Sequence, residues 1–128
     1  MPVDRSLADE DYCYLTTIGR ISGQPREIEI WFAMPPQSVP GRSRPEAPVL
    51  YMLSGGRDRS DWVKNLLQEP RVSVRVGDQT CSGRARVVDD PGEDEVARRL
   101  LFEKYAPRYS GDLDRWRREA LPVAVDLD

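Results

Sequence analysis

The residues of this sequence best suited to chemistry lie in a short loop, "GRISGQPR", at positions 19–26. Gly19 and Gly23 let the backbone come close to a ligand. The side chains of Arg20, Ser22 and Arg26 supply hydrogen-bond donors around it, as a phosphate or carboxylate requires. The alternative is a plain turn whose arginines are merely solvated. Exposed ion pairs contribute only about 0–1 kcal/mol, so stability gives little reason to place arginines here.

A second stretch, "LSGGRDRSDW" at residues 53–62, repeats the combination of small residues and arginines. It leads into a helix, whose free backbone N–H groups and dipole favour an anion at its start. Neither loop has the spacing of a Walker motif or of a dinucleotide fingerprint. Together the two loops indicate a site for one elongated anionic ligand, which the spacing alone does not identify.

The sequence contains no histidine, and this removes several reaction types. Serine–histidine and cysteine–histidine nucleophiles are excluded, as are histidine-ligated metals. Carboxylates, tyrosines, arginines or a bound cofactor must therefore carry any reaction, and no metal site is expected. Cys13 and Cys81 stand alone within strand-like segments, so we expect buried thiols and not a disulfide.

Length and composition limit the class of protein further. With 128 residues, 39% of them apolar, we expect 1–128 to form a single domain whose first segment, 1–11, is flexible. The net charge of -3 gives no general attraction to nucleic acid. No run approaches the roughly 20 apolar residues of a membrane span, and the acidic start does not read as a signal peptide. These features predict a cytoplasmic protein with no nucleic-acid partner and no integral membrane segment.

The elements that must position the loops follow from hydrophobic periodicity. Strands are predicted at 12–18, 26–34, 49–53, 71–76, 79–88 and 121–127, and helices at 60–70, 89–105 and 110–120. In the second helix Asp90 is placed as the cap, and Glu93 as its partner in a capping box. The segment 35–48 has five prolines and is predicted to be a surface loop that adds little to the core. Antiparallel strands joined mostly by short turns indicate a small barrel or curved sheet.

Read together, four segments resemble the deazaflavin-dependent nitroreductase family, which is related to the FMN-binding split barrels. They are "LTTIGRISGQPREIEIWF", "LSGGRDRSDWVKNLLQEPRVSVRV", "GRARVV" and "Y…PRY…W…LPVAV". The resemblance covers about residues 14–126, and it lies in the order and spacing of the four segments. The resemblance implies a mostly β, α+β fold, a split β-barrel of about six antiparallel strands with two or three helices. It also implies coenzyme F-420, an 8-hydroxy-5-deazaflavin whose tail carries a phosphate and a polyglutamate chain, and this acidic tail would explain the arginines.

Site residues are carried over from the resemblance by position. The residues implied to bind the cofactor are Arg20, Ser22, Arg26, Glu27, Ile28, Leu53, Ser54, Gly55, Asp61, Trp62, Val63 and Asn65. For Trp62, a place on the apolar face of the helix is an equal alternative. Tyr109 matches a family tyrosine that lies near the reacting ring, and Tyr105 precedes it. One of these two tyrosines is predicted to face the substrate and to donate a hydrogen bond or proton, although either could simply be a packing residue.

The function implied is hydride transfer from reduced deazaflavin to a small electron-poor acceptor, such as a quinone, an activated double bond or a nitro compound. The sequence departs from the family at Ile21 and Gly55, where basic residues are frequent, and at Ser60 and Val63. FMN, whose shorter tail needs fewer cations, therefore stays open as the cofactor. So does a protein that holds a flavin, tetrapyrrole or lipid without turnover. Related barrels pair over the cofactor, which implies a homodimer.

Overall fold

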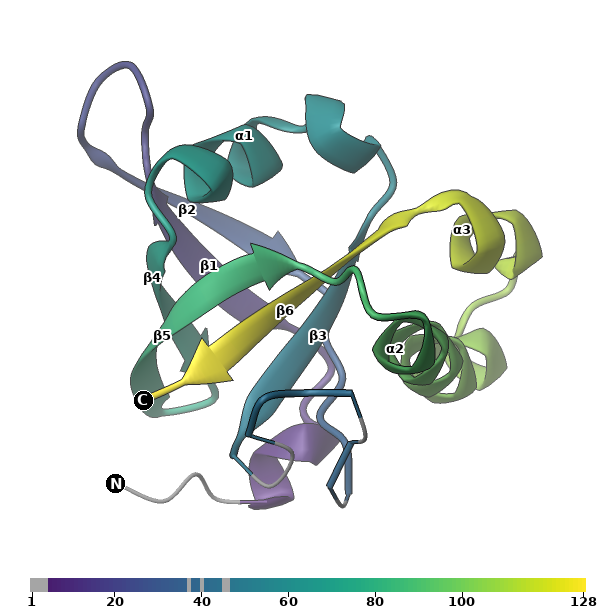
Figure 1. Ribbon diagram of the computed structural model, residues 1–128. Helices are drawn as coiled ribbons and strands as arrows, with labels where there is room; N and C mark the ends of the chain where they lie inside the picture. Colours follow the sequence, from purple (N-terminus) through teal and green to yellow (C-terminus); the bar gives the residue numbers. More distant parts are fainter. Residues whose placement is uncertain (1–4, 37, 40, 45–46) are drawn as a thin grey trace.

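One antiparallel sheet of six strands curls into a half-barrel (Figure 1). The computed structural model describes residues 5–36, 38–39, 41–44 and 47–128. The strands are β1 (Cys13–Ile18), β2 (Pro25–Ile30), β3 (Val49–Ser54), β4 (Arg71–Val76), β5 (Gln79–Val87) and β6 (Leu121–Leu127), in the order β2-β1-β4-β5-β6-β3. A single bridge from Ala33, just beyond β2, to Tyr51 brings the two edge strands together. The barrel thus stays open between β2 and β3, and the split barrel that the resemblance implied is confirmed.

Three α-helices are added to this sheet: α1 (Asp61–Gln68), α2 (Pro91–Tyr105) and α3 (Asp114–Glu119). Short 3-10 helices lie at η1 (Arg5–Asp9), η2 (Arg57–Arg59) and η3 (Ala106–Arg108). In Figure 1, α1 covers one end of the barrel, whereas α2 and α3 lie beside β3 and β6. Within the described residues, no helix combines the length and apolar character needed to cross a membrane.

The apolar residues divide into two cores because β3 is covered on both of its faces. All six residues of β3 are buried. Leu50 and Met52 point into the barrel, where they join Phe32 and Leu66 of α1. Alternate residues of β3, among them Leu53, belong to a second cluster under α2 and α3. The second core therefore fixes α3 against the end of β3.

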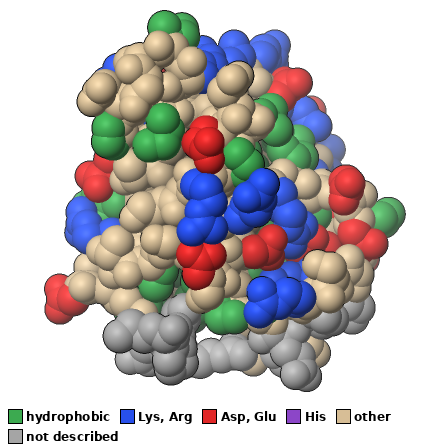
Figure 2. Space-filling view, turned by 60° about the vertical axis from the view of Figure 1, so that its left-hand side comes forward, with side chains coloured by type: hydrophobic (Ala, Val, Ile, Leu, Met, Phe, Trp, Pro, Cys, Tyr) green, Lys and Arg blue, Asp and Glu red, His purple; other side chains and the backbone are tan. Residues whose placement is uncertain are grey.

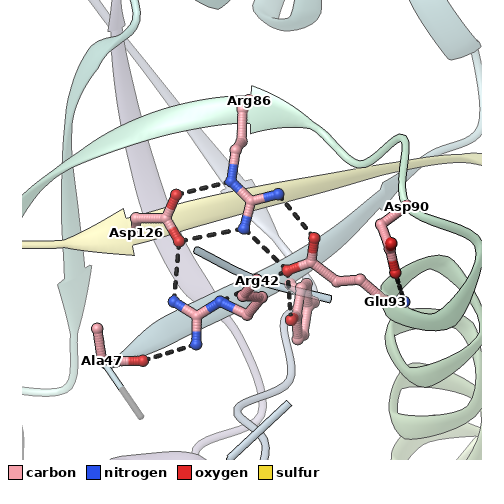
Figure 3. Close-up of polar contacts among 7 residues, drawn as sticks. Arg42, Ala47, Arg86, Asp90, Glu93 and Asp126 are labelled. Atoms are coloured by element: carbon pink, nitrogen blue, oxygen red, sulfur yellow. Dashed lines mark hydrogen bonds and ion pairs between the residues drawn. The ribbon is translucent and has the colours of Figure 1, made fainter. Parts of the chain in front are cut away.

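A network of charges joins distant parts of the chain on the outer side of this sheet (Figure 3). Arg42 and Glu93 are buried in it, whereas the side chains of Arg86 and Asp126 are 34% and 36% exposed. Arg86 of β5 binds Glu93 of α2 through two hydrogen bonds of 2.7 and 2.8 Å, and it also binds Asp126 of β6 at 2.7 Å. Arg42 donates to Asp126 at 3.0 Å, and the hydroxyl of Tyr51 donates to Glu93 at 2.7 Å. Burial by itself would raise the pKa of Asp126, but the hydrogen bonds from the two arginines outweigh it and leave that pKa below the ordinary value.

This network corrects two sequence-based predictions. The side chain of Asp90 accepts a hydrogen bond from the backbone N–H of Glu93, so the helix cap is confirmed. Glu93 does not complete a capping box, because its carboxylate is bound to Arg86. The proline-rich loop also contributes more to the interior than its composition predicts, since Val39 and Arg42 are buried. Residues 37, 40 and 45–46 of this loop lie outside the described residues.

Other predicted elements differ in detail. The second strand ends at Ile30 and not at residue 34, although Phe32 continues into the core. Within the expected flexible segment, residues 5–9 form a 3-10 helix, and Leu7 packs on the barrel core. The two cysteines are free thiols, with Cys13 buried and Cys81 half-buried.

Glu93→Gln should lower the free energy of unfolding by about 3 kcal/mol, because it leaves two arginines facing a single carboxylate in a buried site. Urea unfolding at pH 7, followed by tryptophan fluorescence, measures the change. Glu95→Gln is the matched control, since Glu95 is an exposed residue of the same helix. Equal stability of the two variants would contradict a supporting role for the network.

Candidate functional site

The loop between β1 and β2 is a closed turn that needs both of its glycines. The backbone N–H of Gly19 donates to the carbonyl of Gln24 at 2.8 Å, and that of Gly23 donates to the carbonyl of Gly19 at 2.8 Å. Gly23 has a φ of 72°, which L side chains rarely adopt, and a Cβ on Gly19 would lie 2.6 Å from the Ser22 hydroxyl. The sequence therefore sets the shape of this loop locally.

Asn65 of α1 ties the loop to the helix. Its side-chain oxygen accepts hydrogen bonds from the backbone N–H of Arg20 at 3.1 Å and from the Arg20 guanidinium at 2.9 Å. Its amide nitrogen donates to the hydroxyl of Thr17 at 3.2 Å. Asn65 is only 5% exposed, so these hydrogen bonds replace water at a buried polar group. Asn65 of α1 thus fixes the position of Arg20 in the loop.

A pocket of about 700 Å³ lies between this loop, the start of β2 and α1. The volume is within the usual range for small-molecule sites. Its lining residues are Thr17, Gly19, Arg20, Ile21, Ser22, Pro25, Arg26, Glu27, Ile28, Asp61, Trp62 and Asn65. We call it the arginine pocket. It brings together eight of the predicted cofactor-binding residues, namely Arg20, Ser22, Arg26, Glu27, Ile28, Asp61, Trp62 and Asn65.

The charges of the arginine pocket are mixed. Arg20 forms an ion pair of 3.2 Å with Asp61, whose side chain is 85% exposed. Arg26 instead donates to the neutral hydroxyl of Ser22 at 3.2 Å, so its positive charge is directed at the loop. Glu27 is the second carboxylate of the lining. The face in Figure 2 likewise carries positive and negative side chains next to one another. Arg26 is therefore the cation best placed for an anion.

A second, smaller pocket of about 260 Å³ follows along the same strand. It is lined by Glu29, Ile30, Trp31, Leu53 and Trp116, and we call it the tryptophan pocket. The two pockets use successive parts of the β2 segment, residues 25–28 and then 29–31. The second pocket thus places two indole rings and a carboxylate further along the strand that carries the arginine of the first.

Trp31 is the centre of an aromatic cluster around this second pocket. Its ring stacks on Tyr105 with centroids 4.3 Å apart and an angle of 5° between the planes. The rings of Trp116 and Tyr109 meet Trp31 edge-on, at 5.6 and 5.8 Å. Such contacts fix ring orientation as well as burying surface. The structure thus brings both predicted tyrosines to Trp31.

The two tyrosines differ in access. Tyr105 is 3% exposed, and its hydroxyl lies 3.0 Å from the backbone nitrogen of Phe32 and 2.8 Å from the carbonyl of Asp11. Burial raises the pKa of Tyr105 to about 12. Tyr109 is 48% exposed. A small molecule can therefore reach Tyr109, whereas Tyr105 is buried and stacks on the ring of Trp31.

Four of the predicted cofactor-binding residues lie outside the arginine pocket. Val63 has no exposed surface and belongs to the barrel core. Ser54 is buried, and its hydroxyl lies 2.9 Å from that of Ser60, which therefore does not cap α1 with its side chain. Gly55 is exposed in the following turn. Leu53 lines the tryptophan pocket, away from the predicted arginine cluster.

Four residues of the tryptophan pocket were not predicted from the sequence: Glu29, Ile30, Trp31 and Trp116. A signal was present for Trp31, because it shares the polar side of the predicted strand with Glu27 and Glu29. A large aromatic residue on the polar side of a strand needs a partner outside the barrel core. Trp116 lies 85 positions further along the chain, so no local pattern links it to Trp31.

Comparison with known proteins shows the family and supports the fold. The family model described as F420H(2)-dependent quinone reductase matches residues 2–128. No match was found among curated proteins. Among solved structures, an F420-H2 dependent reductase is 21% identical and has a TM-score of 0.63, with 98% of each chain covered.

Two further solved structures share the fold. A conserved hypothetical protein from Mycobacterium tuberculosis is 20% identical with a TM-score of 0.67, and the match covers 99% of this chain and 81% of that one. The heme storage protein HutZ from Vibrio cholerae is 13% identical with a TM-score of 0.67, covering 95% and 84%. At these identities the likeness shows the fold alone.

Asn65→Ala should release the 19–24 loop from α1. The free energy of unfolding should fall by about 1–3 kcal/mol, because buried donors lose their acceptor. The backbone N–H of Arg20 should also exchange with solvent deuterium much faster, as measured by NMR. Lys64→Ala, at an exposed position of the same helix, should change neither quantity. An unchanged Arg20 exchange rate in Asn65→Ala would refute this tie.

Proposed function

Because the chain belongs to the F420H(2)-dependent quinone reductase family, we propose that it is an oxidoreductase that uses reduced coenzyme F-420. Its acceptor would be a small electron-poor compound, such as a quinone, an activated double bond or a nitro compound. The observation that carries the proposal is the succession of two unlike pockets along β2. One offers arginine donors for an acidic tail, and the next offers flat aromatic surface for ring systems.

The residues of the arginine pocket fit the acidic tail of such a cofactor. Arg26 and Ser22 offer donors at the rim, and Arg20 is held in place by Asn65. Ile28 and Trp62 supply apolar lining beside them. When bound, coenzyme F-420 supplies a hydride. The absence of histidine is then no obstacle, because the protein has only to bind, orient and exclude water.

Tyr109 is the side chain proposed to supply the proton. A quinone that takes up a hydride needs one proton to become a hydroquinone. The exposed phenol of Tyr109 can donate that proton and recover one from water. Its ring meets the ring of Trp31 edge-on, which places this side chain next to a residue of the tryptophan pocket. Tyr105 is proposed to position Trp31, since its own hydroxyl is occupied by the backbone.

One observation favours a second candidate, a flavin-binding protein that uses FMN or has no turnover. The arginine pocket contains two arginines and two carboxylates, so its formal charge is zero in this structure. A cofactor with a shorter tail needs fewer cations. Titration with reduced coenzyme F-420 and with FMN, followed by tryptophan fluorescence and by menadione reduction, separates these functions. Neither binding nor turnover of the deazaflavin would reject the first proposal.

Arg26→Ala should weaken coenzyme F-420 binding about ten- to a hundredfold, because loss of one charge-assisted hydrogen bond costs about 1.5–3 kcal/mol. The effect should shrink at high salt, since the pocket is open to solvent. Fluorescence titration measures both. Arg99→Ala removes an exposed arginine of α2 and should leave the affinity unchanged. Equal affinities for the two variants would exclude Arg26 from the tail site.

Tyr109→Phe should reduce the turnover number for menadione about a hundredfold or more, the usual range for general-acid groups, with little change in cofactor affinity. Stopped-flow oxidation of the reduced cofactor measures the step directly. Tyr12→Phe, at another exposed tyrosine, is the control. A normal rate in Tyr109→Phe would remove this hydroxyl from the mechanism.

A further inference from the structure

The tryptophan pocket combines two indole rings with the carboxylate of Glu29. The proposed transfer of hydride and proton does not use this carboxylate. Glu29 lies beside Trp31 on the same strand, and Trp116 faces them from α3. Resting on the proposed function, we propose that this pocket is the acceptor subsite. We further infer that it selects flat acceptors that are neutral or positively charged over those that carry a negative charge.

The rings of the pocket are held in place before any ligand arrives. Trp31 lies flat on Tyr105. The hydroxyl of Tyr105 is hydrogen-bonded to the backbone carbonyls of Asp11 and Phe32. Trp116 belongs to a short helix that is anchored twice from outside. Arg57 donates to the carbonyl of Glu119, and Arg98 donates to that of Arg117 at 2.7 Å. A rigid aromatic wall binds a flat ligand at low entropic cost.

The size of the pocket limits the acceptor. Its volume of about 260 Å³ is just below the range usual for drug-sized ligands. Leu53 and Ile30 supply its apolar surface. A ligand of one or two fused rings fits this space, whereas a long chain would have to extend into solvent. The shape alone therefore favours a compact, flat head group.

The negative charge of Glu29 can act on a ligand that enters the tryptophan pocket. Its carboxylate accepts a hydrogen bond from the neutral hydroxyl of Tyr14 at 3.2 Å. Arg75 lies over the ring of Tyr14, 4.2 Å from its centroid. Across the residues that the structure describes, no arginine or lysine forms an ion pair with Glu29. An anionic acceptor would meet this negative charge directly.

The aromatic walls act in the same direction. The faces of indole rings carry negative electrostatic potential and attract cations. A carboxylate and two indole rings that line one pocket are groups that attract organic cations. Uncharged quinones are tolerated, because stacking requires no charge. The preference should therefore run from cation through neutral compound to anion.

Three 1,4-naphthoquinones with different charges at position 2 test this inference: the parent compound, its 2-sulfonate and a 2-(trimethylammoniomethyl) derivative. Binding to the cofactor-free protein is followed by NMR through the indole N–H signals of Trp31 and Trp116. The cationic compound should bind about five- to thirtyfold more tightly than the sulfonate, since a unit charge at about 4 Å contributes about fivefold in water and the sign reverses between the two. Both indole signals should shift.

Glu29→Gln should abolish most of this charge preference, whereas Glu95→Gln, on an exposed part of α2, should preserve it. Trp116→Ala should weaken all three compounds alike. Equal affinities for the three compounds in the unaltered protein, or shifts confined to signals outside the pocket, would overturn the inference. Cofactor binding with turnover of the parent naphthoquinone but no charge preference would reject the subsite alone. The charge preference without deazaflavin binding would reject the proposed function alone.

Discussion

The candidate site depends on the hydrogen bonds of one buried amide side chain. Asn65 projects from α1 across the mouth of the barrel and binds both the backbone and the side chain of Arg20. Without that tie, the loop would be joined to α1 only by the exposed ion pair between Arg20 and Asp61. A flexible arginine side chain in such a loop would lose side-chain entropy on binding a ligand. Because Asn65 fixes Arg20 beforehand, part of that entropy is already lost on folding, when the core supplies the compensating energy.

The second half of the site is held by a different kind of contact. The cluster of Arg86, Glu93 and Asp126 fixes the start of α2 against the sheet (Figure 3). The end of the same helix carries Tyr105, on which Trp31 lies. A buried ion network is weak as a source of stability compared with apolar packing, but it admits few alternative arrangements. Here the network fixes the direction in which α2 follows β5. It thereby fixes the position of Tyr105, on which the ring of Trp31 lies.

The fold and the arginine loop could be predicted from the sequence because their causes are local. Period-two alternation gives the strands, and the two glycines with their arginines lie within eight residues. The tryptophan pocket could not, since residues 31, 53 and 116 meet only after the sheet has curled. Glu93 shows the same limit, because local spacing assigns it to a cap while the folded protein uses its carboxylate elsewhere. Val39 and Arg42 are buried for a similar reason, as partners of elements that are distant in sequence.

The polar character of β2 can be understood from two demands on one strand. β2 is an edge of the sheet, and an apolar edge invites pairing with other chains. Arg26, Glu27 and Glu29 place charges along it, which protects the edge while the barrel stays open. The same charges face the two pockets, with an arginine directed at one and a carboxylate at the other. Opposite charges at successive positions would orient an acidic cofactor and a neutral or cationic acceptor along the strand, each at its own end.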